Sequence, residues 1–205
     1  MSLVTEADQQ RIAETITAAE RRTSGEIVAV VTAESASYMS APLLWAAAAA
    51  LLLPWPLIFF TWWPVQWIYI LQLLVFLALV LILMQRPLRF ALVPASVKRQ
   101  RAHRRAVEQF LAQNLHTTDG RTGVLIFVSA AERYAEIVAD SGIHAKVAQS
   151  RWQAIVDELT QAIGDGRAGD GFVTAIEAVG TELARHFPPG SSDPGQLPNH
   201  LIVLE

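Results

Sequence analysis

An uncharged stretch from Ser35 to Gln85 constrains this chain most, because its 51 residues contain no Asp, Glu, Lys or Arg. Two apolar segments of 20 residues lie within it, Ala41–Phe60 and Val65–Met84. At about 1.5 Å of helical rise per residue, each segment is about 30 Å long, which is the thickness of the hydrocarbon core of a bilayer. Only a short joint separates the two segments. The sequence therefore predicts a two-helix transmembrane hairpin.

Aromatic side chains gather at the joint between the two segments. Trp62 and Trp63 lie in the joint, and three more rings flank it, those of Trp55, Trp67 and Tyr69. Such rings prefer the headgroup level, where an apolar body and a polar N–H or O–H are both accommodated. We therefore expect the joint at the far membrane interface.

Two other structures compete with this hairpin. The segments could be buried helices of a soluble protein, but a chain of 205 residues has little polar surface left to enclose them. Pro54 and Pro56 interrupt the first segment and could make it re-entrant or kinked. A single crossing would put the two polar parts of the chain on opposite sides of the membrane, where they would have to fold separately.

The orientation of the hairpin follows from a basic segment directly after it. Residues 86–105 carry seven Arg and Lys side chains and no acid. Basic clusters beside a membrane span stay on the cytoplasmic side, and two spans return the chain to the side where it began. We therefore expect an integral protein of an inner or plasma membrane, with two spans and with both termini and the polar domain in the cytoplasm.

The charges and the composition also limit the partners. The basic segment suits anionic lipid headgroups, whereas residues 106–205 carry 13 acids against six bases and offer no basic face for nucleic acid. The chain has no cysteine, which excludes disulfides, thiol catalysis and cysteine metal sites. The expected partners are membrane lipid and an unidentified protein.

Outside the apolar stretch, the sequence alternates between helical and strand patterns. Helical spacing of apolar residues predicts four helices, and runs of β-branched and apolar residues predict three strands. A short connection between the second and third strands favours an antiparallel hairpin. In chain order we expect helix 5–22, strand 26–32, helix 102–115, strands 122–129 and 134–140, helices 151–164 and 172–187, and a short apolar end, 201–204, that docks on the sheet.

The first predicted strand has no partner of its own, so its partner layer must come from the polar part beyond the hairpin. We therefore expect an α/β (α+β) fold, in which a small mixed β-sheet sandwiched by helices is interrupted by the two-helix transmembrane hairpin. The expected organisation is a first domain part, a hairpin, a basic neck, a second domain part and an extended C-terminal tail, at residues 1–38, 39–85, 86–101, 102–188 and 189–205.

Four short segments carry a resemblance to a known family: Ser24–Thr32, Gly123–Ser129, Glu136–Gly142 and Gly169–Phe172. In these segments and in the order of its elements, the polar part of the chain resembles the TPM domain family. The resemblance implies a small mixed sheet between helices. It also implies the acid phosphatase activity and the calcium binding that are ascribed to some members.

The residues that could carry chemistry are few. The five histidines show no metal-ligand spacing, and no nucleophile elbow, glycine-rich phosphate loop or zinc helix motif is present, so we assign no catalytic residue. Four aspartates lie in predicted loops, and their oxygens could hold calcium or magnesium. Ordinary turn chemistry is the alternative, because Asp before Gly or Ser-Gly bonds to its own backbone. The candidate metal ligands are Asp119, Asp140, Asp165 and Asp170.

Three classes of function compete. A membrane-anchored accessory or protein-interaction module is favoured, because the anchor is well marked in the sequence and the chemistry is not. The alternative is a metal-dependent acid phosphatase-like hydrolase. A transporter or channel fits least, because the two spans contain no charge and only two polar groups of any size, Gln66 and Gln72.

Overall fold

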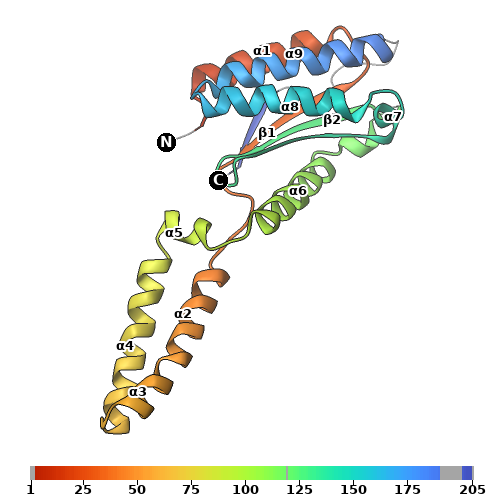
Figure 1. Ribbon diagram of the computed structural model, residues 1–205. Coiled ribbons are helices and arrows are strands. Elements are labelled where there is room, and N and C mark those ends of the chain that lie inside the picture. The colour runs from red at the N-terminus through yellow and green to blue at the C-terminus, as the bar shows by residue number, and fades with distance from the viewer. Residues whose placement is uncertain (1–2, 119, 190–199, 205) are drawn as a thin grey trace. The chain divides into compact units, whose positions relative to one another are not determined.

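The computed structural model of the chain describes residues 3–118, 120–189 and 200–204 (Figure 1). The chain divides into two compact units. One unit combines Met1–Ser35 with Arg99–Glu205, and the other is Ala36–Lys98. The polar residues on the two sides of the apolar stretch thus fold together, as the lone first strand predicted.

The first unit is built on a four-stranded mixed sheet in the order β3-β2-β1-β4. Strand β1 (Glu26–Thr32) runs parallel to β2 (Gly123–Ser129) and to β4 (Leu201–Leu204). Strand β3 (Tyr134–Ala139) pairs with β2 in the predicted antiparallel hairpin. The apolar C-terminal end docks on the sheet as expected, whereas most of the predicted tail lies outside the described residues.

Three helices cover one face of this sheet (Figure 1): α1 (Glu6–Glu20), α8 (Gln149–Gly164) and α9 (Ala168–His186). Alternate residues of β1 point into this layer, where Ile27, Ala29 and Val31 join a buried apolar core with the helices. Thr5 caps α1 and Asp8 completes a capping box, which fixes the start of the helix one residue later than the sequence predicted.

The opposite face is covered by α6 (Ala95–Ala112) and by the short helix η1 (Leu115–Thr117). The other residues of β1, Val28 and Val30, pack here against Phe110 and Leu115. Helix α6 begins seven residues before the predicted helix 102–115, because the Pro94 carbonyl accepts the N–H groups of Val97 and Lys98 and opens the helix inside the basic neck. The sandwich of helices, sheet and helices confirms the predicted fold class.

The second unit contains the apolar stretch. Helices α2 (Ser40–Leu52) and α3 (Pro54–Phe60) form the first apolar segment, α4 (Val65–Leu83) forms the second, and α5 (Arg86–Ala91) follows. Both segments are long and apolar enough to cross a membrane, and only 11% and 6% of their most apolar stretches are buried. These helices therefore do not fill the core of a soluble domain. Pro54 begins α3, and Leu53, the single residue between α2 and α3, keeps right-handed helical backbone angles.

Close helix contacts in the first unit depend on glycine. A Cβ atom added at Gly169 would lie 2.3 Å from the Asp8 carboxylate, and one added at Gly180 would lie 2.8 Å from the Ala19 Cβ. Helices α1 and α9 can approach this closely only because both positions lack a side chain. Gly169 belongs to one of the four segments that resemble the TPM family, and in this chain it allows α1 and α9 to pack closely.

We predict that replacing residues 40–97 by a short Gly/Ser linker leaves a soluble domain that melts cooperatively, because β1 and β2 pair along their whole length. A chain of residues 102–205 alone should be markedly less stable, since β2 and β4 would both lose β1. Thermal unfolding followed by circular dichroism measures both. Equal melting temperatures would contradict the shared sheet.

We also predict that Gly169→Ala destabilises the domain by about 1–3 kcal/mol, because the new methyl group forces Asp8 out of its capping position. The matched control is Gly164→Ala, where no atom lies within 4 Å of the added Cβ. That change should be neutral or stabilising by up to about 1 kcal/mol, since alanine favours helix more than glycine. Urea unfolding of both variants separates packing from propensity, and a destabilised control would refute the packing argument.

Candidate functional site

One end of the sheet carries a buried aspartate with an unpaired oxygen. Asp140 follows β3 directly and caps α7 (Ser141–His144). One carboxylate oxygen accepts hydrogen bonds from the Ser141 N–H at 2.6 Å and from its hydroxyl at 3.1 Å. The second oxygen is fully buried and has no hydrogen-bond partner among the described residues. A buried carboxylate oxygen without a donor is costly, so this position suits a ligand that satisfies it.

The loop before β2 lies beside this aspartate. The Asp140 N–H donates to the Gly123 carbonyl at 3.0 Å, which fixes the start of β2 against the end of β3. A Cβ atom added at Gly142 would lie 2.4 Å from the Gly120 oxygen and 2.7 Å from the Arg121 oxygen. Two backbone carbonyl groups therefore approach Gly142, in the first turn of the helix that Asp140 caps. Carboxylate and carbonyl oxygens are the ligands that calcium and magnesium prefer.

Backbone conformation holds this loop in place. Gly120 and Arg121 both have positive φ angles, 75° and 54°, and the Thr118 hydroxyl accepts the Thr122 N–H at 3.0 Å. An Arg121 nitrogen lies 4.0 Å from the paired oxygen of Asp140, and the Arg121 side chain is 64% exposed. Asp119, the predicted companion of Asp140, lies outside the described residues. Its described neighbours Thr118 and Gly120 belong to this loop.

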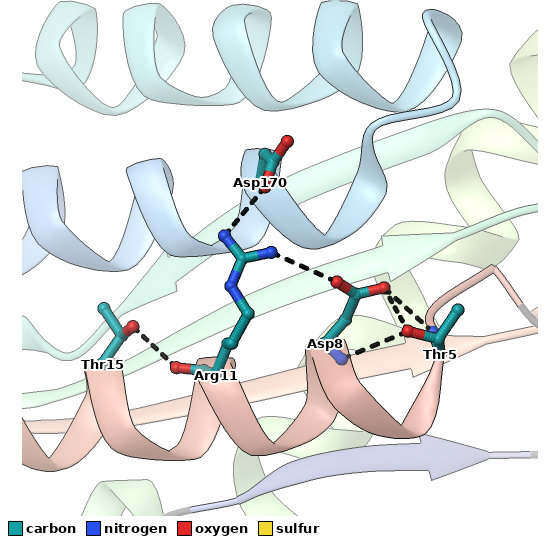
Figure 2. Close-up of polar contacts among 5 residues, drawn as sticks. All are labelled: Thr5, Asp8, Arg11, Thr15 and Asp170. Carbon is teal, nitrogen blue, oxygen red and sulfur yellow. Dashed lines mark hydrogen bonds and ion pairs between the residues drawn. The ribbon is translucent and has the colours of Figure 1, made fainter.

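Asp170 lies elsewhere, in the first turn of α9. Its carboxylate accepts a hydrogen bond from Arg11 of α1 at 2.9 Å (Figure 2). The same guanidinium contacts Asp8 at 3.4 Å. Hydrogen bonds from the Thr5 hydroxyl and backbone hold the pKa of Asp8 below its ordinary value, with a smaller contribution from the charge of Arg11. Asp170 therefore has an arginine partner and ties two helices together.

Asp165 lies at the end of α8, where its side chain is 51% exposed and pairs with Arg167 at 2.9 Å. Helix α8 has 16 residues and is about 24 Å long, and α7 lies at its other end (Figure 1), where Asp140 caps α7. Helix length thus keeps Asp165 and Asp170 away from Asp140. Among the described residues, no group of three or more acidic or histidine side chains could hold a metal ion. A cation at Asp119 and Asp140 stays a prediction.

The sequence analysis did not single out two further acids that lie at the same end of the sheet. Glu20 and Glu26 are 4% and 6% exposed, at the end of α1 and the start of β1. A Glu20 oxygen accepts the Ile27 N–H at 2.9 Å, and the Glu26 N–H donates to the Thr122 carbonyl. The sequence feature that could have indicated these two acids is their position, one on either side of the Thr23-Ser24-Gly25 turn that precedes an apolar strand.

A second polar cluster joins α6 to β3. Glu136 accepts the Tyr134 hydroxyl at 2.9 Å and lies 2.9 Å from Nδ1 of His103. Burial raises the pKa of Tyr134, the Glu136 carboxylate adds to this shift, and Arg99 opposes it. The His103 side chain is 57% exposed, and the cluster joins the edge strand to the helix through side-chain hydrogen bonds.

A third polar contact lies at the carboxyl end of β1, opposite the Asp140 end. Glu132, in the turn between β2 and β3, accepts hydrogen bonds from the Ser35 N–H at 3.0 Å and from the Ser129 hydroxyl. Ser35 is the residue at which the chain leaves the first unit. The segment that leads from β1 to the apolar helices is thus hydrogen-bonded to the β2–β3 turn.

Comparisons with known proteins agree with this architecture. The family model of the TPM domain matches residues 85–182. The solved NMR structure of the BA42 protein from the psychrophilic bacterium Bizionia argentinensis is similar in fold, with a TM-score of 0.62 and 19% sequence identity over 98% of this chain and 96% of that one. No curated protein matches the chain. Three of the four segments that carry the resemblance lie within the matched residues, and the fourth, Ser24–Thr32, contains β1. Residues 85–182 are therefore similar to the TPM domain family, and β1 pairs with β2 from the other side of the apolar stretch.

Proposed function

We propose that this chain is a membrane-anchored TPM domain that serves as an accessory or protein-interaction module. The observation that carries the proposal is the exposed apolar surface of α2, α3 and α4, of which only 11% and 6% is buried in the two segments. Exposed apolar surface on this scale needs a non-aqueous environment. A bilayer of an inner or plasma membrane provides one, with lipid as the first partner of the chain.

The way in which the helices are attached supports an anchoring role. Both connections to the apolar unit leave the TPM domain at the carboxyl end of β1: Ser35 is fastened to Glu132, and Arg99 is close enough to Tyr134 to act on its pKa. Two connections at one end restrict rotation of the domain more than a single linker would. The Asp140 end lies about 20 Å from these connections along the seven residues of β1, and it is the end that we propose for a partner.

The basic residues between the apolar helices and the domain favour a cytoplasmic domain that lies near anionic headgroups. Seven Arg and Lys side chains fall within residues 86–105, and each would contribute about 1 kcal/mol next to an anionic surface. Helix α6 carries several of these side chains in regular helical order. Both termini would then lie in the cytoplasm. None of the residues that the structure describes identifies the protein partner.

The second candidate function is a metal-dependent acid phosphatase-like hydrolase. One observation favours it: a buried Asp140 oxygen has no partner among the described residues, and the Gly120 and Arg121 carbonyl groups approach Gly142, two residues further along the chain. These groups fit calcium or magnesium, which would supply a Lewis acid for a phosphate ester. Arg121 is exposed and could hold a phosphate oxygen. No nucleophile or general base is assigned, so the accessory role remains the main proposal.

We predict that the full chain stays in the membrane pellet after washing at alkaline pH, and that reporters fused to Ser2 and to Glu205 both report cytoplasm. Two spans place both ends on one side, and the basic segment selects that side. A matched fusion after Trp62, in the joint between the helices, should report the opposite side. Release of the washed chain into the supernatant, or an external signal from either terminus, would refute the anchor or its orientation.

We predict that millimolar calcium raises the melting temperature of the domain and that Asp140→Asn or Asp119→Asn abolishes the rise. A cation that binds only the folded state stabilises it by about 2.7 kcal/mol at 100 times its Kd. Asp165→Asn is the matched control, because Asp165 lies at the far end of α8, and this variant should keep the full response. Differential scanning calorimetry with calcium, magnesium and chelator measures the shift. An unmoved transition with both metals would remove the phosphatase alternative.

A further inference from the structure

We propose that two copies of this chain associate within the membrane through Gln72. The inference rests on the proposed membrane anchor and goes beyond it, because it names a docking surface and its partner. Gln72 is the eighth of the 19 residues of α4, about 11 Å from the start of a helix about 28 Å long. If α4 spans the bilayer, this carboxamide lies near its midplane.

The Gln72 side chain is unsatisfied within the hairpin. No hydrogen bond joins it to any residue that the structure describes. The side chain is half-buried and lines two grooves between α4 and the first apolar segment, one bordered by Pro54 and Trp55 and the other by Ala50 and Phe76. In hydrocarbon no water completes its bonds, so the amide has a strong preference for another polar group.

The first apolar segment contributes a backbone acceptor, at Ala50, to the lining of one of these grooves. Pro54 and Pro56 have no N–H group, so they cannot donate to the Ala50 and Leu52 carbonyls four residues earlier. Ala50 borders the same groove as Gln72. The groove is thus lined by a carboxamide and by Ala50, which lies near the junction of α2 and α3.

The depth and chemistry of Gln72 favour a second copy as the occupant. All copies insert in the same orientation, so Gln72 of one copy automatically lies at the same depth as Gln72 of the other. A carboxamide is both donor and acceptor, so the two side chains can form reciprocal hydrogen bonds about a two-fold axis along the membrane normal. The helix of an unrelated protein would have to present a polar group at this depth by separate means.

A matched residue makes the proposal testable. Gln66 has the same side chain but is the second residue of α4, next to the joint, where the headgroup region can satisfy it. Interhelical hydrogen bonds of this kind correspond to a change in association on the order of tenfold for a reciprocal pair. Gln72→Leu should therefore weaken association by about this factor, and Gln66→Leu should leave it unchanged.

The experiment uses the full chain with Glu158→Cys, an exposed position on α8, labelled with donor or acceptor dyes. No other cysteine competes for the label. Energy transfer between copies is measured in phosphatidylcholine and phosphatidylglycerol vesicles over a range of protein-to-lipid ratios. We expect transfer that rises with protein density and a midpoint that Gln72→Leu moves about tenfold higher.

Three results would overturn the proposal. The first is energy transfer between unaltered chains that is no higher than chance proximity gives, the second is an equal shift for both glutamine variants, and the third is the absence of a disulfide at the same face. A disulfide formed by Phe76→Cys, one turn from Gln72 in the same groove, is the expected support, and its absence in the associated state would exclude this face. Alkaline washing of the same vesicles tests the anchor separately, because Gln72→Leu makes the helix more apolar and should stay in the membrane whether or not the copies associate.

Discussion

The parallel pairing of β1 with β2 is the contact on which the rest of the structure depends. It joins Glu26–Thr32 to Gly123–Ser129 across the whole apolar stretch, in a register that matches all seven residues of each strand. Every β1 residue is buried. Its odd-numbered and even-numbered apolar residues pack into the two cores on opposite faces of the sheet. Without this strand, the helices on either face would have no continuous sheet to pack against, and β4 would have no strand to pair with. The long loop that must close before the pairing forms makes the contact costly in entropy, and burial on both faces offsets that cost.

The sequence predicted most of this fold because its signals were local or periodic. Apolar spacing located α1, α8 and α9, and β-branched runs located the strands to within one residue. The start of α6 was placed seven residues late, because a run of Arg and Lys looks like a solvated neck although its residues favour helix. The lone first strand was the non-local clue. A strand of β-branched residues without a partner implies that its sheet continues elsewhere in the chain.

The sequence predicted the candidate site correctly only for residues whose distance from one another follows from the pairing of consecutive strands. An antiparallel hairpin brings the residue after β3 to the start of β2, which is why Asp140 meets the loop that contains Asp119. Nothing in the spacing of Asp165 and Asp170 revealed that α8 would carry them to the other end of the sheet, where Arg167 and Arg11 pair with them. Contacts between α6 and β3, such as Glu136 with His103, join residues 33 apart and follow from tertiary packing alone.

The position of the apolar helices follows from the demands of a parallel strand pair. Parallel neighbours need a long crossover that leaves the carboxyl end of one strand and returns to the amino end of the next, usually through a helix on one face. Here α6 is that helix, and the apolar helices occupy the start of the crossover, between Ser35 and α6. An insertion at this point costs the sheet nothing, because the chain has to leave the strand in any case. Topology thus places both connections to the apolar helices at the carboxyl end of β1, whereas Asp140, Glu20 and Glu26 lie at the amino end.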